Sequence, residues 1–204
     1  LIKYVESEVT DPLIAEMLVN RKIFRLIENY GPEMVNDSHL DAFNRFVKSP
    51  DLVEKYNALI EKWEKIAAGN ISPDFSCVDI DGNRFSLSDF RGKYLYIDVW
   101  ATWCGPCRIE IPHMKELEEK YQGKDITFVS ISCDTDPEAW KGSVSAGMTG
   151  VQLHFDEGDT FMENYMISGI PHFILLDKEG KIISSNMSRP SDPATAVKLD
   201  QLLN

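Results

Sequence analysis

The sequence predicts an α/β protein in which a mixed central sheet with helices on both faces follows a small all-helical region. Residues 1–70 place apolar side chains at helical spacing, whereas short apolar runs alternate with amphipathic segments after Gly69. The chain has 204 residues, of which 43% are hydrophobic, enough for one ordinary domain and a smaller unit. We therefore expect a helical region over residues 1–70 and an α/β domain over residues 71–204.

Three helices are expected in the first region. The first begins at Asp11-Pro12, because aspartate is a favoured N-cap and proline a favoured first helical residue, and it stops at Gly31-Pro32. The second opens at Asp37 or Ser38 and stops near Ser49-Pro50, and the third covers residues 51–68. Their apolar positions are Leu13, Met17, Ile23, Phe24 and Ile27, then Leu40, Phe43, Phe46 and Val47, then Leu52, Tyr56, Leu59, Ile60 and Trp63. This region is either a packing subdomain or an arm that binds a partner or a second copy.

The α/β domain opens with a hairpin, residues 75–80 and 83–86, around an Asp81-Gly82 turn. Residues 94–100 form an almost continuous apolar run, which is typical of a buried central strand. We expect further strands over residues 126–132, 151–155, 171–177 and 181–187, and helices over residues 105–121, 137–146, 160–166 and 193–203. In the helix 105–121, the inner side is assigned to Ile109, Met114 and Leu117. This order of elements predicts the mixed sheet.

The net charge of the chain is −12, and residues 71–204 contribute −9 of it. This acidity argues against nucleic acid and against anionic membranes as partners, because both attract basic surfaces. No apolar run approaches the roughly 18 residues of a membrane-spanning helix. Because the chain begins with Leu1 rather than Met, we expect a processed form, and any membrane contact would come through an anchor in the missing upstream segment.

The main functional signal is a cysteine pair, Cys104 and Cys107, between the central strand and the following helix. A cysteine at a helix N-terminus is favoured as a thiolate, and a two-residue spacer brings both sulfurs within bonding distance. Cys104 is expected to be the exposed, attacking sulfur and Cys107 the shielded, resolving one. Gly105 would let a substrate backbone approach, and Pro106 sets the first helical turn. Trp103 is expected at the rim of the site, and Trp100 lies either there or in the core.

A zinc site or an inert structural disulfide is an alternative use of such a pair. A zinc site needs two more ligands, and the other cysteines and the histidines are scattered singly along the chain. The strand-to-helix context also favours redox chemistry over a structural bond. We therefore expect neither a metal nor an organic cofactor. Cys77 and Cys133 are interpreted as buried free cysteines, with a third redox role for Cys133 left open.

Residues from about 71 to the C-terminus resemble the thioredoxin superfamily, and within it the extracytoplasmic thiol–disulfide oxidoreductases of the bacterial TlpA/ResA group. The resemblance rests on the Trp-Cys-Gly-Pro-Cys motif and its flanks, SPDFSCVDIDGNRFSLSDFRGKYLYIDVWATWCGPCRIEIP, and on YMISGIPHFILLDKEGKI further on. It implies a thioredoxin-like fold with an added N-terminal β-hairpin. It does not cover the first seventy residues.

The resemblance also implies roles for single residues. Pro171 matches the cis-proline of the family, and Ile170 before it would face the substrate. Asp98 matches the buried acid of thioredoxin, although many TlpA/ResA-like members have asparagine there. The apolar neighbours of Asp98 along the strand predict a raised pKa, which would suit proton exchange with Cys107. The alternative is that Asp98 is a core acid whose hydrogen bonds are satisfied and which has no catalytic role. Glu110 matches an acid near the cysteines, and the alternative is a solvated surface carboxylate.

We expect thiol–disulfide exchange, with a protein disulfide or dithiol as substrate and a mixed-disulfide intermediate. The Gly-Pro spacer resembles that of reducing members, which favours a reductase fed by an upstream thiol donor. The resemblance implies the periplasm or the outer face of the bacterial envelope. One alternative is a peroxiredoxin-like thiol peroxidase, but the proline of the Pro-x-x-x-Thr-x-x-Cys loop is missing before Cys104. Another is a binding module without catalysis, built on the same fold.

Overall fold

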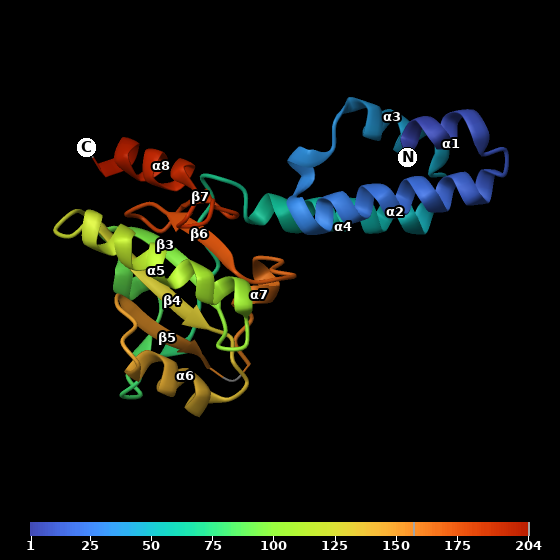
Figure 1. Cartoon of the computed structure of the whole chain (residues 1–204). Helices are drawn as coiled ribbons and strands as arrows, with labels where there is room; N and C mark the ends of the chain where they lie inside the picture. The colour runs from blue at the N-terminus through green and yellow to red at the C-terminus, as the bar shows by residue number, and fades with distance from the viewer. Residues whose placement is uncertain (157, 204) are drawn as a thin grey trace. The chain divides into compact units, whose positions relative to one another are not determined.

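The structure is a computed structural model, and it describes residues 1–156 and 158–203. The chain divides into two compact units, Leu1–Lys65 and Ile66–Asn204. The first unit is helical (Figure 1, blue to teal), and its elements are α1 (Ile2–Glu8), α2 (Pro12–Tyr30), η1 (Pro32–Met34), α3 (Asp37–Phe46) and α4 (Pro50–Lys65). The sequence did not predict α1.

The helical unit has a core of its own. The carboxylate of Asp11 caps α2 by accepting hydrogen bonds from the backbone N–H groups of Leu13 and Ile14 at 2.9 and 3.1 Å. The buried stripe of α2 consists of Ala15, Val19, Ile23 and Ile27, and it packs with side chains of α1, α3 and α4.

Two positions assigned to the apolar face of α2 were wrong. Leu13 and Met17 are 74% and 57% exposed. Each precedes a residue of the buried stripe by two positions, which is a rotation of about 200° around a helix, so both point to solvent. The inward positions are taken by the smaller Ala15 and Val19 instead.

The second unit contains a seven-stranded mixed sheet, which confirms the predicted α/β architecture. The sheet order is β2-β1-β5-β4-β3-β6-β7. β3, β4 and β5 are parallel, and the pairings on both sides of them are antiparallel. The elements are β1 (Cys77–Val78), β2 (Arg84–Phe85), η2 (Leu87–Phe90), β3 (Tyr94–Trp100), α5 (Gly105–Lys120), β4 (Ile126–Ser132), α6 (Pro137–Ser145), β5 (Val151–Phe155), α7 (Phe161–Asn164), β6 (His172–Leu176), β7 (Ile182–Ser184) and α8 (Pro193–Leu203). The predicted N-terminal hairpin is present as β1 and β2, with only two residues in each strand.

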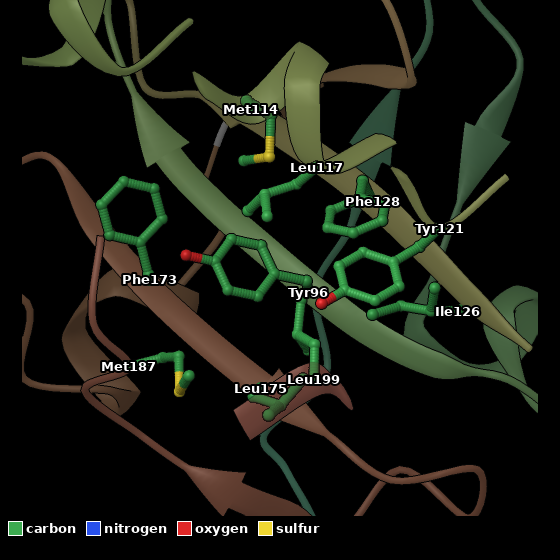
Figure 2. Close-up of a cluster of buried hydrophobic side chains, with 10 residues drawn as sticks. All are labelled: Tyr96, Met114, Leu117, Tyr121, Ile126, Phe128, Phe173, Leu175, Met187 and Leu199. Atoms are coloured by element: carbon green, nitrogen blue, oxygen red, sulfur yellow. The ribbon is translucent and has the colours of Figure 1, made fainter. Parts of the chain in front are cut away.

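Figure 2 shows the core between α5, α8 and one face of the sheet. It contains Tyr96, Met114, Leu117, Tyr121, Ile126, Phe128, Phe173, Leu175, Met187 and Leu199. The ring of Tyr96 lies at the centre, 5.7 Å from that of Phe128 and 5.8 Å from that of Phe173 between centroids. Burying each large side chain contributes about 1.5–3 kcal/mol, so this cluster fixes α5 firmly on β3.

The inner side of α5 differs from the prediction at one residue. Ile109 is 67% exposed, because the buried positions are Cys107, Glu110, Met114 and Leu117, and Ile109 points away from that face. Side chains alternate along β3, so Asp98 lies on the same face as Tyr96 and therefore beneath α5. No helix in the described part of the chain is both long and apolar enough to cross a membrane.

Candidate active site

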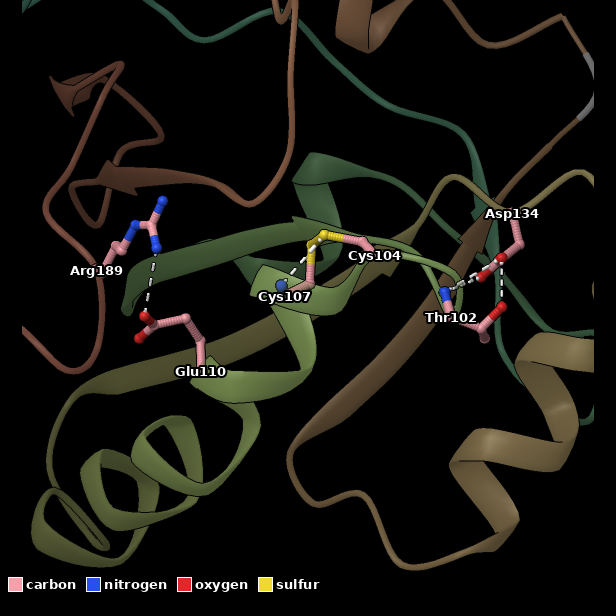
Figure 3. Close-up of a disulfide and its surroundings, with 6 residues drawn as sticks. All are labelled: Thr102, Cys104, Cys107, Glu110, Asp134 and Arg189. Carbon is pink, nitrogen blue, oxygen red and sulfur yellow. Dashed lines mark hydrogen bonds and ion pairs between the residues drawn. A yellow bond between two sulfur atoms is a disulfide. The ribbon is translucent and has the colours of Figure 1, made fainter.

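The site is built around the start of α5, where Cys104 is the N-cap residue and Gly105 and Pro106 form the first turn (Figure 3). Cys104 and Cys107 form a disulfide with their Cα atoms 5.3 Å apart. The backbone N–H of Cys107 donates a hydrogen bond to the Sγ atom of Cys104 at 3.1 Å. A thiolate at this position would keep that donor and the positive end of the helix dipole.

The expected exposure of Cys104 is wrong for the disulfide form, in which this residue is only 5% exposed. Cys104 packs in a buried cluster with Trp100, Ala101, Cys107 and Trp140. Trp103, in contrast, is 69% exposed, whereas Trp100 belongs to the core. Gly105 has open space around its Cα, since a Cβ there would meet no atom within 4 Å.

Asp98 is buried beneath α5, and its Oδ1 atom has no hydrogen-bond partner among the described residues. Burial raises the pKa of Asp98 to about 8; the nearby charge of Glu110 also raises it, and a hydrogen bond with Ser130 opposes both. Ser130 is the residue opposite Asp98 on β4. The raised pKa agrees with the one expected from the apolar neighbours on the strand, and the role in proton transfer stays a prediction.

Glu110 lies in the interior of the unit rather than on its surface. Its carboxylate accepts hydrogen bonds from the backbone N–H of Ser191 at 3.0 Å and from the Ser191 hydroxyl at 2.9 Å. The guanidinium of Arg189 lies 3.8 Å away. The alternative of a solvated surface acid is therefore excluded.

The segment before β6 reaches the same site. The peptide bond between Ile170 and Pro171 is cis, as the resemblance implied. Ile170 packs against the buried cluster that contains both cysteines. The next residue, His172, is held by a hydrogen bond from its Nε2 to the carbonyl oxygen of Ser185 at 2.7 Å, and burial lowers its pKa. The substrate-binding roles of Ile170 and Pro171 stay predictions.

Sequence reasoning missed one residue of this site, Asp134, which follows β4. Its buried carboxylate accepts hydrogen bonds from the backbone N–H and the hydroxyl of Thr102, two residues before Cys104 (Figure 3). A signal was available, because Asp134 comes two residues after the end of a strand parallel to β3, and functional side chains gather at the carboxyl ends of parallel strands.

The two other cysteines are not part of the disulfide. Cys77 is buried, and burial together with nearby acids raises its pKa. Cys133 is half-buried and lines a cavity of about 820 Å³; burial, and then the charge of Asp134, raises its pKa. Both are therefore protonated thiols at neutral pH. Within residues 1–156 and 158–203, no group of three or more His, Cys, Asp or Glu residues is placed to hold a metal ion.

Comparisons with known proteins agree with this geometry. The family model described as Redoxin matches residues 67–203. The thiol-disulfide oxidoreductase ResA of Bacillus cereus is 33% identical over 128 residues, which are 63% of this chain and 74% of that protein.

Solved structures give a similar result. A Bacteroides vulgatus protein proposed to be a thiol-disulfide oxidoreductase is 59% identical, with a TM-score of 0.60 over 67% of this chain and 91% of that one. The thioredoxin domain of another Bacteroides vulgatus thiol-disulfide oxidoreductase is 30% identical, with a TM-score of 0.62 over 68% of this chain and 99% of that one.

Proposed function

This chain belongs to the Redoxin family, and from that membership we propose that it reduces protein disulfides by cycling Cys104 and Cys107 between a dithiol and a disulfide. The predicted thioredoxin-like fold is confirmed, and the chain is a thiol–disulfide oxidoreductase, as its relatives are named. The observation that carries the proposal is the cysteine pair at the start of α5, with the sulfur of Cys104 facing the Cys107 N–H.

The proposed reaction has two exchange steps. The Cys104 thiolate attacks one sulfur of a substrate disulfide, so that an S–S bond forms to Cys104 and the other substrate sulfur leaves as a thiolate. Cys107, after losing its proton, then attacks the Sγ of Cys104 and releases the second substrate sulfur. The substrate gains two electrons and two protons overall, and the Cys104–Cys107 disulfide results. An upstream dithiol protein reverses these steps on the enzyme and restores the reduced pair.

Asp98 is proposed as the base that receives the proton of Cys107. Its position under α5 and its pKa of about 8 support this role, because a base works best when its pKa is near the working pH. Glu110 is proposed to act beside it by adding negative charge near Asp98. We assign substrate contacts to Trp103, Gly105, Pro106, Ile170 and Pro171. The open space at Gly105 and the exposure of Trp103 support this assignment.

The family implies protein disulfides as substrates. We propose that electrons come from a thiol protein, that neither a metal nor an organic cofactor takes part, and that no nucleic acid is bound. Membership of an extracytoplasmic group, which the sequence resemblance implies, supports the periplasm or the outer envelope face as the location. The reducing direction is supported by the Gly105-Pro106 spacer.

Insulin reduction with dithiothreitol as donor tests the function. We expect the wild-type protein to accelerate precipitation of the insulin B chain and Cys104→Ser to be inactive. Cys107→Ser, reduced and then freed of dithiothreitol, should accumulate a mixed disulfide with insulin, visible on a non-reducing gel. An active Cys104→Ser protein would refute the mechanism. If, at equal enzyme concentration, the protein oxidised a reduced model protein faster than it reduced insulin, the proposed reducing direction would be wrong.

A further inference from the structure

The carboxylate of Asp134, just beyond the end of β4, binds the turn that carries Cys104. Asp134 accepts the Thr102 N–H at 2.9 Å through Oδ2 and at 3.2 Å through Oδ1, and the Thr102 hydroxyl at 2.7 Å through Oδ1. Its Oδ2 also accepts the hydroxyl of Ser132 at 2.6 Å. Hydrogen bonds to a charged acceptor are roughly twice as strong as neutral ones, so these contacts hold the turn firmly.

The backbone of Asp134 is itself hydrogen-bonded to Ser132 on β4 and to His154 on β5. Its backbone N–H donates to the Ser132 hydroxyl oxygen at 3.0 Å, and its carbonyl oxygen accepts the Nε2–H of His154 on β5 at 2.8 Å. The preceding residue, Cys133, donates its N–H to the carbonyl of Trp100 at 2.9 Å and extends the β3–β4 pairing. Asp134 therefore joins the ends of β3, β4 and β5 at one point.

The turn after β3 sets where the sulfur of Cys104 lies. Thr102 is bound to Asp134, and the Cys104 N–H donates to the carbonyl of Ala101 at 3.1 Å across the same turn. The Cys104 sulfur then accepts the Cys107 N–H. A displacement of Thr102 would move Cys104 away from the helix N-terminus, where its thiolate is stabilised.

We propose that Asp134 is a positioning residue for thiol–disulfide exchange, holding the Ala101–Cys104 turn so that the Cys104 sulfur sits at the start of α5. It does not touch the reacting sulfurs and acts through Thr102. This role rests on the proposed function, since it matters only if Cys104 is the attacking sulfur.

The test compares Asp134→Ala with Asp134→Asn in the full chain. Both remove the same negative charge, but asparagine keeps one oxygen that can accept from Thr102, and its Nδ2 group can donate to Ser132. The difference between the two variants therefore reports the hydrogen bonds and the packing of this side chain, with the charge held constant. Asp81→Asn, on the exposed turn of the hairpin, is the control for net charge. Insulin reduction gives kcat/KM, and alkylation of Cys104 by iodoacetamide across pH gives the midpoint of its thiolate formation.

We expect Asp134→Ala to lower kcat/KM about tenfold or more, because small misplacements of a reacting group are costly, and Asp134→Asn to recover most of that loss. The alkylation midpoint should lie at higher pH in the alanine than in the asparagine variant. Equal kcat/KM and equal midpoints in these two variants would overturn the role of Asp134. An inactive wild-type protein would instead refute the proposed function.

Thr102→Val covers the case in which Asp134→Ala does not fold. It removes the hydroxyl donor and leaves the N–H bonds in place, so we expect a smaller loss of kcat/KM, about threefold. In the Asp134→Asn background the same change should cost less than in the wild type, because the two residues share one interaction. Fully additive losses would contradict the proposal.

Discussion

The carboxylate of Glu110 is bound by both the backbone N–H and the hydroxyl of Ser191, at 3.0 and 2.9 Å. This pairing ties α5 to the segment before α8 and keeps a negative charge in the interior, one helical turn after Cys107. The charge raises the pKa of Asp98, the proposed base. If Asp98 is the base, as proposed, we expect Ser191 to affect proton transfer indirectly, because it holds Glu110 in place.

Glu110→Gln should shift the pH dependence of exchange to lower pH. The resolving step is expected to accelerate as Asp98 loses its proton, and without the neighbouring charge of Glu110 the pKa of Asp98 falls. Rapid-mixing measurements of mixed-disulfide decay across pH would locate the inflection. Ser191→Ala is the matched control, because it removes a hydrogen bond and keeps the charge. An inflection that stays in place in Glu110→Gln, or moves to higher pH, would contradict this coupling.

Asp98 should also make the oxidised protein less stable as the pH rises. Its folded-state pKa is about 8, above that of an unfolded aspartate, so between about pH 4 and pH 8 the folded state holds a proton that the unfolded chain releases. The contribution of Asp98 to the free energy of unfolding is therefore complete below about pH 4 and is lost as the pH rises to about 8. The loss is at most about 1.4 kcal/mol per pH unit.

Urea unfolding of the oxidised protein at several pH values checks this expectation. Asp98→Asn should flatten the decline in the free energy of unfolding between about pH 5 and pH 8. Ser130→Ala should extend the decline to higher pH, because the hydrogen bond with Ser130 lowers the pKa of Asp98. Parallel curves for wild type and Asp98→Asn would show that Asp98 does not titrate in this range.

Local signals explain why the sheet and the cysteine pair could be predicted. A buried strand such as β3 shows an almost continuous apolar run. The start of α5 could be recognised because Cys104, Pro106 and Cys107 stand close together in the sequence. The short α1 lacks a side-chain cap, so nothing in its sequence marks its beginning. The burial of Cys104 and the contact between Asp134 and Thr102 depend on how distant strands pair, which periodicity within one segment does not report.

The two faces of α2 should respond differently to truncation. Ile23 is fully buried in the helical unit, so Ile23→Ala should lower the free energy of unfolding by about 2–5 kcal/mol. Met17 is 57% exposed, and Met17→Ala should change it by no more than about 0.5 kcal/mol. Urea unfolding of the full chain followed by far-UV circular dichroism measures both. Similar losses in the two variants would mean that Met17 is covered in solution, as the alternative of a partner-binding or dimerising arm would require.

Cys133→Ser should leave disulfide reduction unchanged to within about twofold, because a thiol with a raised pKa carries little thiolate at neutral pH. In the reduced, folded protein, Cys104 should react quickly with a thiol reagent such as DTNB, because a helix N-terminus favours its thiolate, while Cys77 and Cys133 should react slowly because burial raises the pKa of each. The Cys133→Ser variant should lose one slow thiol and no fast one. A loss of activity of about tenfold in this variant would instead identify Cys133 as a third redox cysteine, acting from the cavity wall beside Asp134.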